Sequence, residues 1–153
     1  MKVLMICTGN ICRSPTAEAV LRSKLAAAGL GRRVQVDSAG LEGYHVGDPP
    51  DRRAQRHAAT RGYDLSGQVA RRLHEADFER FDWVLAMDLG HLRELQRQCP
   101  PEFGARVRLL MDFSDTPGTE VPDPYYGNAA GFELVLDLVE RGCDGLVSSL
   151  RAR

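Results

Sequence analysis

The chain has 153 residues, of which 43% are hydrophobic and 27% are charged, and its formal net charge is −1. A chain of this length and composition can bury its own core, so we expect a single domain over residues 1–153. The balanced charge argues against broad nucleic-acid binding, which needs a basic face, and no segment is apolar and long enough to span a membrane.

Short apolar runs alternate with helical patterns along the first half of the chain. The run Lys2–Cys7 is continuously apolar after its lysine, which is typical of a strand buried on both faces. Apolar residues at helical spacing predict a helix over residues 15–28, which Gly29 ends. A second short strand is expected over residues 34–37, and a second helix over residues 51–61.

The same alternation continues in the second half. Strands are predicted over residues 81–87 and 107–111, with a helix over residues 89–98 between them. Residues 114–128 hold three prolines and three acidic residues, which predicts a long loop. A terminal helix is expected over residues 129–150.

This order of elements predicts an α/β fold, a three-layer αβα sandwich in which helices cover both faces of a four-stranded parallel sheet. Gly142 and Gly145 are weak points in the terminal helix, because glycine is a poor helix former. Ligands of such folds bind beyond the carboxyl ends of the strands. Both the segment after the first strand and the loop at 114–128 should lie at that end.

The segment CTGNICRSP, residues 7–15, follows directly on the first strand. Gly9 and Asn10 permit backbone conformations in which successive N–H groups point inward, and such a ring binds an anion. Arg13 can hold two oxygens of a phosphate group. The N-terminus of the following helix adds partial positive charge. The segment therefore predicts a site for a tetrahedral oxyanion.

Cys7 would lie beneath that oxyanion. The N–H dipoles, the helix N-terminus and the guanidinium all stabilise a thiolate, which is then poised to attack phosphorus. Ser14 could donate a hydrogen bond to the sulfur and help it leave in a second step. The expelled oxygen needs a proton, and Asp123, held between Pro122 and Pro124, is the candidate general acid.

The chain resembles the low molecular weight protein tyrosine phosphatases. CTGNICRSP near the N-terminus and DPYYG late in the chain match the two signatures of that family, and DSAG, the MD pair after the third strand and the length also fit. The resemblance implies a flavodoxin-like (Rossmann-like) sheet order and no cofactor or metal. It also implies that Cys7 is the nucleophile, Arg13 the phosphate-binding and transition-state residue, and Asp123 the acid and then the base.

The resemblance assigns roles to further residues. Asn10, Ser14 and Ser38 would hold the thiol loop in shape by hydrogen bonds. Besides Arg13, the phosphate-binding residues would be Thr8, Gly9, Asn10, Ile11, Cys12 and Ser14. The substrate pocket would be framed by Ile11, Tyr44, Tyr125 and Tyr126, which suits a flat aryl phosphate.

Three other functions have to be weighed. Arsenate reductases share the fold and the thiol loop, but they need further relay cysteines and lack DPYY. Arginine phosphatases carry a threonine where Ile11 stands here. A phosphocarrier module would accept phosphate from a partner and would have no need of Asp123. We therefore predict a metal-independent phosphatase that hydrolyses phosphotyrosine and other aryl phosphomonoesters through a phosphocysteine on Cys7.

The partners expected are phosphotyrosine-containing proteins, with a tyrosine kinase as one candidate, and the chain is expected to be a monomer or to self-associate weakly. Four scattered cysteines are too few for a disulfide framework, and no signal-peptide pattern or CxxC zinc motif occurs, so a reducing cytoplasm is the expected setting. Cys12 is interpreted as a small apolar residue packed behind the loop. The family resemblance implies a second role, in which Cys12 traps an oxidised Cys7 as a reversible disulfide.

The remaining charged and imidazole side chains are assigned to the surface. The run Arg52–Arg53 with Arg56 is interpreted as a solvated helix face, and His45 as a solvated loop residue near the pocket rim. The three other histidines, His57, His74 and His91, are also expected at surface positions on or near helices.

Overall fold

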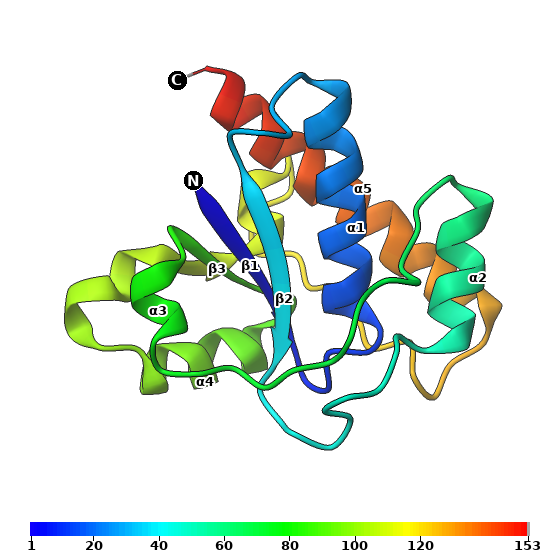
Figure 1. Cartoon of the computed structure of the whole chain (residues 1–153), viewed down its shortest axis with the longest axis horizontal. Coiled ribbons are helices and arrows are strands. Elements are labelled where there is room, and N and C mark those ends of the chain that lie inside the picture. Colours follow the sequence, from blue (N-terminus) through cyan, green and yellow to red (C-terminus); the bar gives the residue numbers. More distant parts are fainter. Residues whose placement is uncertain (153) are drawn as a thin grey trace.

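The structure is a computed structural model that describes residues 1–152. Its sheet has four parallel strands in the order β2-β1-β3-β4 (Figure 1), which confirms the predicted flavodoxin-like topology. The strands are β1 (Lys2–Cys7), β2 (Gln35–Gly40), β3 (Trp83–Ala86) and β4 (Val107–Leu109).

Helices cover both faces of the sheet, as predicted. The α-helices are α1 (Arg13–Ala27), α2 (Arg52–Thr60), α3 (Asp77–Arg80), α4 (Leu89–Gln98) and α5 (Ala129–Arg151). Two 3-10 helices are η1 (Pro101–Arg106) and η2 (Leu110–Phe113). Figure 1 shows α1 and α5 together on one side of the sheet and α3 and α4 on the other, with α2 beside α5.

The central strand β1 explains why its sequence is continuously apolar. Successive side chains of a strand point to opposite faces. Val3 and Met5 therefore pack in the core beneath α1 and α5, whereas Leu4 and Ile6 pack in the second core beneath α3 and α4. Because both faces are covered, no position after Lys2 in this strand is left to solvent.

The predicted boundaries differ from the structure where tertiary contacts decide them. β2 continues to Gly40, which pairs with Cys7, although the strand was expected to stop at Asp37. A Cβ at position 40 would lie 2.9 Å from the carbonyl oxygen of Thr8, so glycine is required where β2 meets the thiol loop. β4 stops at Leu109, because η2 begins at the next residue.

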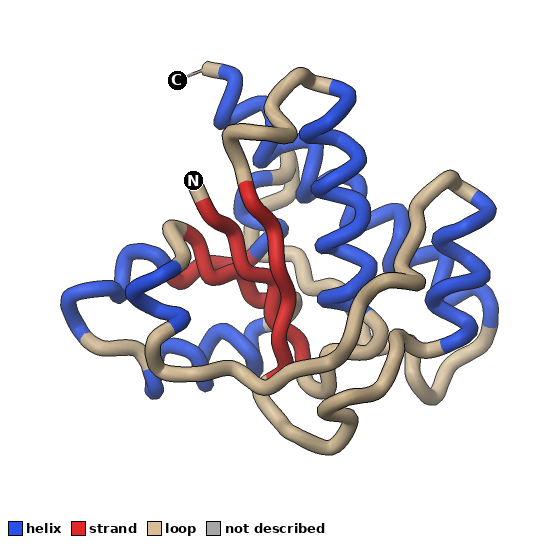
Figure 2. The backbone as a smooth tube through the Cα atoms, in the orientation of Figure 1, coloured by secondary structure: helices blue, strands red, loops and turns tan. Residues whose placement is uncertain are grey.

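The loops that follow the strands gather at one end of the molecule (Figure 2). They include the segment between β1 and α1, the long connection after β2, and the chain between η2 and α5. In a parallel sheet all carboxyl ends lie at the same edge. The two segments predicted to carry chemistry are therefore brought to one place.

α5 is continuous through Gly142 and Gly145. At these two glycines the helix packs closely against η2 and Ser114. A Cβ at Gly145 would lie 1.7 Å from the carbonyl oxygen of Phe113, and one at Gly142 would lie 2.8 Å from Leu110 Cγ. These glycines are therefore packing positions.

Gly145→Ala is expected to destabilise the protein, although alanine favours an isolated helix by about 1 kcal/mol. The backbone of Phe113 has to move to admit the methyl group, so we expect a loss of at least about 2 kcal/mol in the free energy of unfolding. Urea denaturation measures it. Gly131→Ala in the same helix is the matched control, because its Cβ would meet Pro124 at an ordinary 3.8 Å; equal stability of the two variants would contradict the packing argument.

Candidate active site

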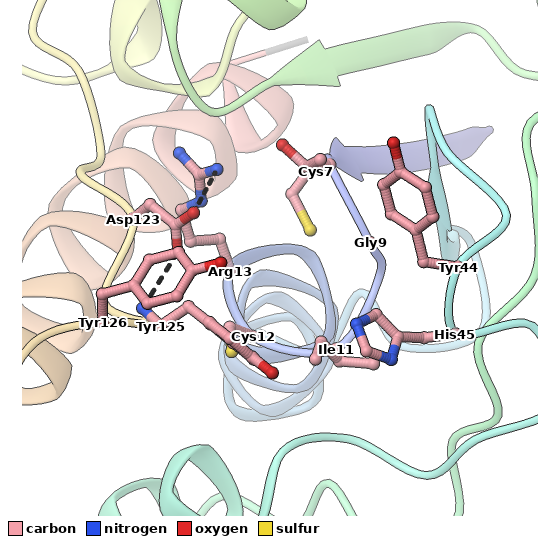
Figure 3. Close-up of a pocket in the computed structure, with 11 residues that line it drawn as sticks. Cys7, Gly9, Ile11, Cys12, Arg13, Tyr44, His45, Asp123, Tyr125 and Tyr126 are labelled. Atoms are coloured by element: carbon pink, nitrogen blue, oxygen red, sulfur yellow. Dashed lines mark hydrogen bonds and ion pairs between the residues drawn. The ribbon is translucent and has the colours of Figure 1, made fainter.

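A pocket of about 330 Å³ opens at the carboxyl end of the sheet. Figure 3 shows the Cys7 side chain directed into it, with Arg13 on one side and Tyr44 on the other. Its lining residues come from the thiol loop, the connection after β2 and the loop before α5: Cys7, Thr8, Gly9, Ile11, Cys12, Arg13, Tyr44, His45, Asp123, Tyr125 and Tyr126.

The thiol loop is held by a buried hydrogen-bond network centred on Asn10. This residue has a positive φ of 59°, and its amide Nδ2 donates to Ser14 Oγ at 2.8 Å and to Ser38 Oγ at 2.9 Å. Ser14 Oγ lies 3.0 Å from the Cys7 sulfur. Ser38 in turn donates to Glu18, whose pKa is raised by burial. The loop conformation therefore depends on side chains from both β2 and α1.

Cys7 is the last residue of β1, and α1 begins at Arg13 on the far side of the loop. The Cys7 side chain is buried except at the pocket. The free N–H groups of the first helical turn carry partial positive charge toward the same space. The thiol thus lies among groups that stabilise an anion.

Arg13 is buried and tightly oriented. Its Nη1 donates to Asp88 Oδ2 at 2.8 Å and to the carbonyl oxygen of Val121 at 3.0 Å. Its Nη2 lies 3.8 Å from Asp123 Oδ2. Burial would raise the pKa of Asp88, but the backbone N–H of His91 and the Arg13 guanidinium outweigh it, so this pKa is lowered. The carboxylate therefore stays charged and anchors the guanidinium.

Asp123 lies on the loop before α5, with half of its side chain exposed. Its Oδ1 accepts a hydrogen bond from the backbone N–H of Tyr125 at 3.0 Å, which closes a local turn. Two residues earlier, the backbone N–H of Val121 donates to the carbonyl oxygen of Met87 at 2.8 Å, and the carbonyl oxygen of Val121 accepts from Arg13 Nη1. The loop is thus attached to the end of β3 just before it carries the carboxyl group to the pocket.

Aromatic side chains form the rim of the pocket. Tyr44 and Tyr126 are 77% and 93% exposed, and the rings of Tyr125 and Tyr126 pack edge-on at 4.9 Å. His45, expected to be a solvated loop residue, lines the pocket and lies 6.4 Å from the Tyr125 ring. These rings present flat apolar surface around the thiol.

Arg53 departs from the predicted solvated helix face, because its side chain is only partly exposed, whereas Arg52 and Arg56 are exposed as expected. Its guanidinium lies over the rings of Tyr125 at 5.5 Å and Phe132 at 4.9 Å. Asp51 holds it through two hydrogen bonds, of 3.1 and 2.9 Å. The backbone N–H of Asp51 donates to the carbonyl oxygen of Ile11 at 2.8 Å. These contacts connect the thiol loop to the loop that carries Asp123.

The predicted surface position of His91 is wrong. It was assigned to the surface, but it is only 6% exposed and its Nε2 lies 2.8 Å from Thr8 Oγ1. One signal was available, because His91 and Leu95 are four residues apart and both face inward on α4. Asp88 caps that helix by accepting from the His91 N–H at 2.7 Å, which fixes where the imidazole lies.

Burial affects the thiols of the three other cysteines. Burial, and then the negative charge of Asp51, raises the pKa of Cys12, so its sulfur stays a protonated thiol. Burial also raises the pKa of Cys143 and of Cys99. All four cysteines are free. Within residues 1–152, no cluster of side chains offers a metal site and no helix has the length and apolarity of a membrane span.

Comparison with known proteins gives a consistent result. A family model described as "Low molecular weight phosphotyrosine protein phosphatase" matches residues 2–153. A low molecular weight protein-tyrosine-phosphatase of Streptomyces coelicolor is 46% identical, over 98% of this chain and 93% of that protein. The human low molecular weight phosphotyrosine protein phosphatase is 40% identical, over 92% of this chain and 90% of that protein.

Solved structures agree with the sequence relatives. The crystal structure of a protein tyrosine phosphatase from Entamoeba histolytica superposes with a TM-score of 0.95 at 39% identity, and it covers 99% of this chain and 97% of that chain. With relatives this similar over almost the full length of both proteins, the chain belongs to the low molecular weight phosphotyrosine protein phosphatase family.

Proposed function

We propose that the chain acts as one domain, residues 1–153, which hydrolyses phosphotyrosine and other aryl phosphomonoesters through a phosphocysteine on Cys7. One observation carries this proposal. A thiol, a guanidinium and a carboxyl group, those of Cys7, Arg13 and Asp123, line the same pocket, although Asp123 lies more than a hundred residues away from the other two in the sequence. Attack, charge stabilisation and proton transfer require these three groups.

In the first step, the phosphate group of the substrate enters the loop, where backbone N–H groups and Arg13 hold its oxygens. Because Arg13 Nη1 is engaged by Asp88 and Val121, the Nε and Nη2 side of the guanidinium is the side left for the oxyanion. The Cys7 thiolate attacks phosphorus, and a bond forms between sulfur and phosphorus. The bond to the ester oxygen breaks, and Asp123 gives its proton to the leaving phenoxide.

In the second step, water attacks the phosphocysteine. The Asp123 carboxylate accepts a proton from that water, inorganic phosphate forms, and the bond between sulfur and phosphorus breaks. Ser14, whose Oγ lies 3.0 Å from the sulfur, donates a hydrogen bond to the returning thiolate. The enzyme regains its starting protonation. Activity should favour mildly acidic pH, because Asp123 has to be protonated while Cys7 is ionised.

The rim supports an aryl substrate. Ile11 and the three tyrosines Tyr44, Tyr125 and Tyr126 offer apolar and aromatic surface to a phosphorylated ring. The substrates proposed are phosphotyrosine proteins, a tyrosine kinase among them. A reducing cytoplasm is the proposed setting, because the mechanism needs Cys7 as a thiol. The exposed Tyr126 would allow at most weak self-association of a monomer.

A chromogenic aryl phosphate tests the function directly. We expect metal-independent turnover that vanadate inhibits and that a chelator leaves unchanged. Arsenate added with a thiol reductant tests the reductase alternative, and we expect no arsenite. Stoichiometric phosphorylation of the protein without release of phosphate would instead support a phosphocarrier.

Peroxide is expected to inactivate the enzyme reversibly, with Cys12 as the protecting residue. Peroxide oxidises the Cys7 thiolate to a sulfenic acid and is itself reduced to hydroxide. The Cys12 thiol then attacks that sulfur, its proton and the sulfenic hydroxyl leave as water, and a disulfide joins Cys7 to Cys12. A dithiol reductant restores both thiols. Cys12→Ser should lose most of this recovery, measured as activity after peroxide and then reductant, whereas Cys99→Ser should keep it; full recovery of Cys12→Ser would rule out the disulfide.

A further inference from the structure

His91 is a buried imidazole in the first turn of α4, next to two residues of the thiol loop. Its Nε2 lies 2.8 Å from Thr8 Oγ1 and 3.4 Å from Arg13 Nη2. Its Nδ1 is buried without a hydrogen-bond partner among the described residues. A buried polar side chain with an unpaired atom is costly, and an apolar residue would fill this place without that cost. The imidazole therefore calls for a functional explanation.

The neighbours of the ring determine its tautomer. Arg13 Nη2 can only donate, so a proton on His91 Nε2 would face another N–H, whereas a bare Nε2 accepts from both Thr8 and Arg13. On the other side of the ring, Nδ1 faces Asp88 Oδ1 at 3.4 Å. No hydrogen bond forms across that distance, but the negative charge of Asp88 still favours a proton on Nδ1, because a bare Nδ1 would place a lone pair near the carboxylate. The surroundings of Nε2 and of Nδ1 therefore favour the same neutral tautomer, with the proton on Nδ1.

The charge of the ring follows from the same surroundings. Burial, and then the positive charge of Arg13, lowers the pKa of His91 to about 4, although Asp88 and Asp123 act in the opposite direction. The imidazole is therefore neutral at the mildly acidic pH that the mechanism favours. A neutral ring can accept hydrogen bonds next to a guanidinium, which a charged ring could not do.

We propose that His91 is a positioning residue of the phosphatase reaction: its neutral imidazole, protonated on Nδ1, accepts at Nε2 from Thr8 and Arg13 and so fixes the loop on both sides of the phosphate site. Thr8 directly follows the nucleophile, and Arg13 ends the loop. Asp88 holds Nη1 of the guanidinium while His91 borders Nη2. This inference rests on the proposed roles of Cys7 and Arg13.

Two substitutions separate hydrogen bonding from packing. His91→Leu removes the acceptor, whereas His91→Gln can place an amide oxygen close to the position of Nε2. We expect kcat for an aryl phosphate to fall about 10- to 100-fold in His91→Leu, since small displacements of catalytic groups have effects of this size. Inhibition by inorganic phosphate should weaken in parallel. His91→Gln should recover most of both quantities.

Leu95→Ala is the matched control, because it opens a cavity on the same buried face of α4 without touching the loop. It should lower stability but leave kcat nearly unchanged. Thr8→Val removes the same hydrogen bond from the loop side, so it keeps the test valid if His91→Leu does not fold. Its effect should not add to that of His91→Leu in the double variant.

A measurement on the unmodified protein completes the test. Nitrogen-15 NMR of the histidine side chains should show His91 neutral, with its proton on Nδ1. A proton on Nε2 would overturn the proposal. Normal kcat in folded His91→Leu and Thr8→Val would also overturn it. Equal losses of kcat in His91→Leu, His91→Gln and Leu95→Ala would overturn it as well. Cys7→Ser separates this inference from the proposed function. If Cys7→Ser abolishes turnover but one of the contradicting outcomes above occurs, only the inference about His91 fails. Turnover by Cys7→Ser would overturn the proposed function itself.

Discussion

Cys7→Ser is expected to reduce kcat for an aryl phosphate by at least about 10⁴-fold, because a serine hydroxyl in this site cannot replace the thiolate as nucleophile and leaving group. The N–H groups of the loop and Arg13 remain in place, so the variant should still bind inorganic phosphate. Steady-state kinetics measure the first quantity and calorimetric titration with phosphate the second. Serine is nearly the same size as cysteine, and the loop network through Asn10 does not require the sulfur.

Cys99→Ser is the control for the loss of a thiol as such. Cys99 lies at the C-terminal end of α4, outside the pocket, so its substitution should leave kcat unchanged. Turnover by Cys7→Ser close to that of this control would show that the sulfur is not the nucleophile. Loss of phosphate binding together with turnover would indicate instead that the loop has collapsed.

Asp123→Asn is expected to lower kcat/KM most for aryl phosphates whose phenol is a poor leaving group. An amide has no acidic proton to give, so cleavage of a phenyl phosphate should slow by about 10²- to 10⁴-fold. A nitrophenyl phosphate, whose leaving group is stable as an anion, should be affected much less. The measurement is kcat/KM across a series of aryl phosphates, plotted against the acidity of the phenol.

Asp115→Asn is the matched control, because Asp115 is an exposed carboxylate of the same loop and does not line the pocket. It should change neither the rate nor its dependence on the leaving group. If Asp123→Asn slowed good and poor leaving groups equally, another residue would have to be the acid.

Much of the fold was predictable because local patterns agreed with the tertiary structure. The continuous apolar run of β1 is the direct result of two covered faces, and the helical spacing in α1, α4 and α5 matches their buried sides. Prediction was less accurate where a segment owes its conformation to its neighbours. The polar and small residues 38–40 extend β2 beyond its predicted end because β1 pairs with them, and α3 is too short for any periodicity.

The sequence by itself determined the chemistry of the site, because Cys7, Arg13 and Ser14 are close in the chain and the helix start that serves them is local. Only the tertiary structure decided which distant side chains complete it. Arg53 meets Tyr125, and His91 meets Thr8 and Arg13, across more than seventy residues in each case. A charged or imidazole side chain is usually solvated. Its burial therefore depends on partners that the folded chain supplies, which no local pattern encodes.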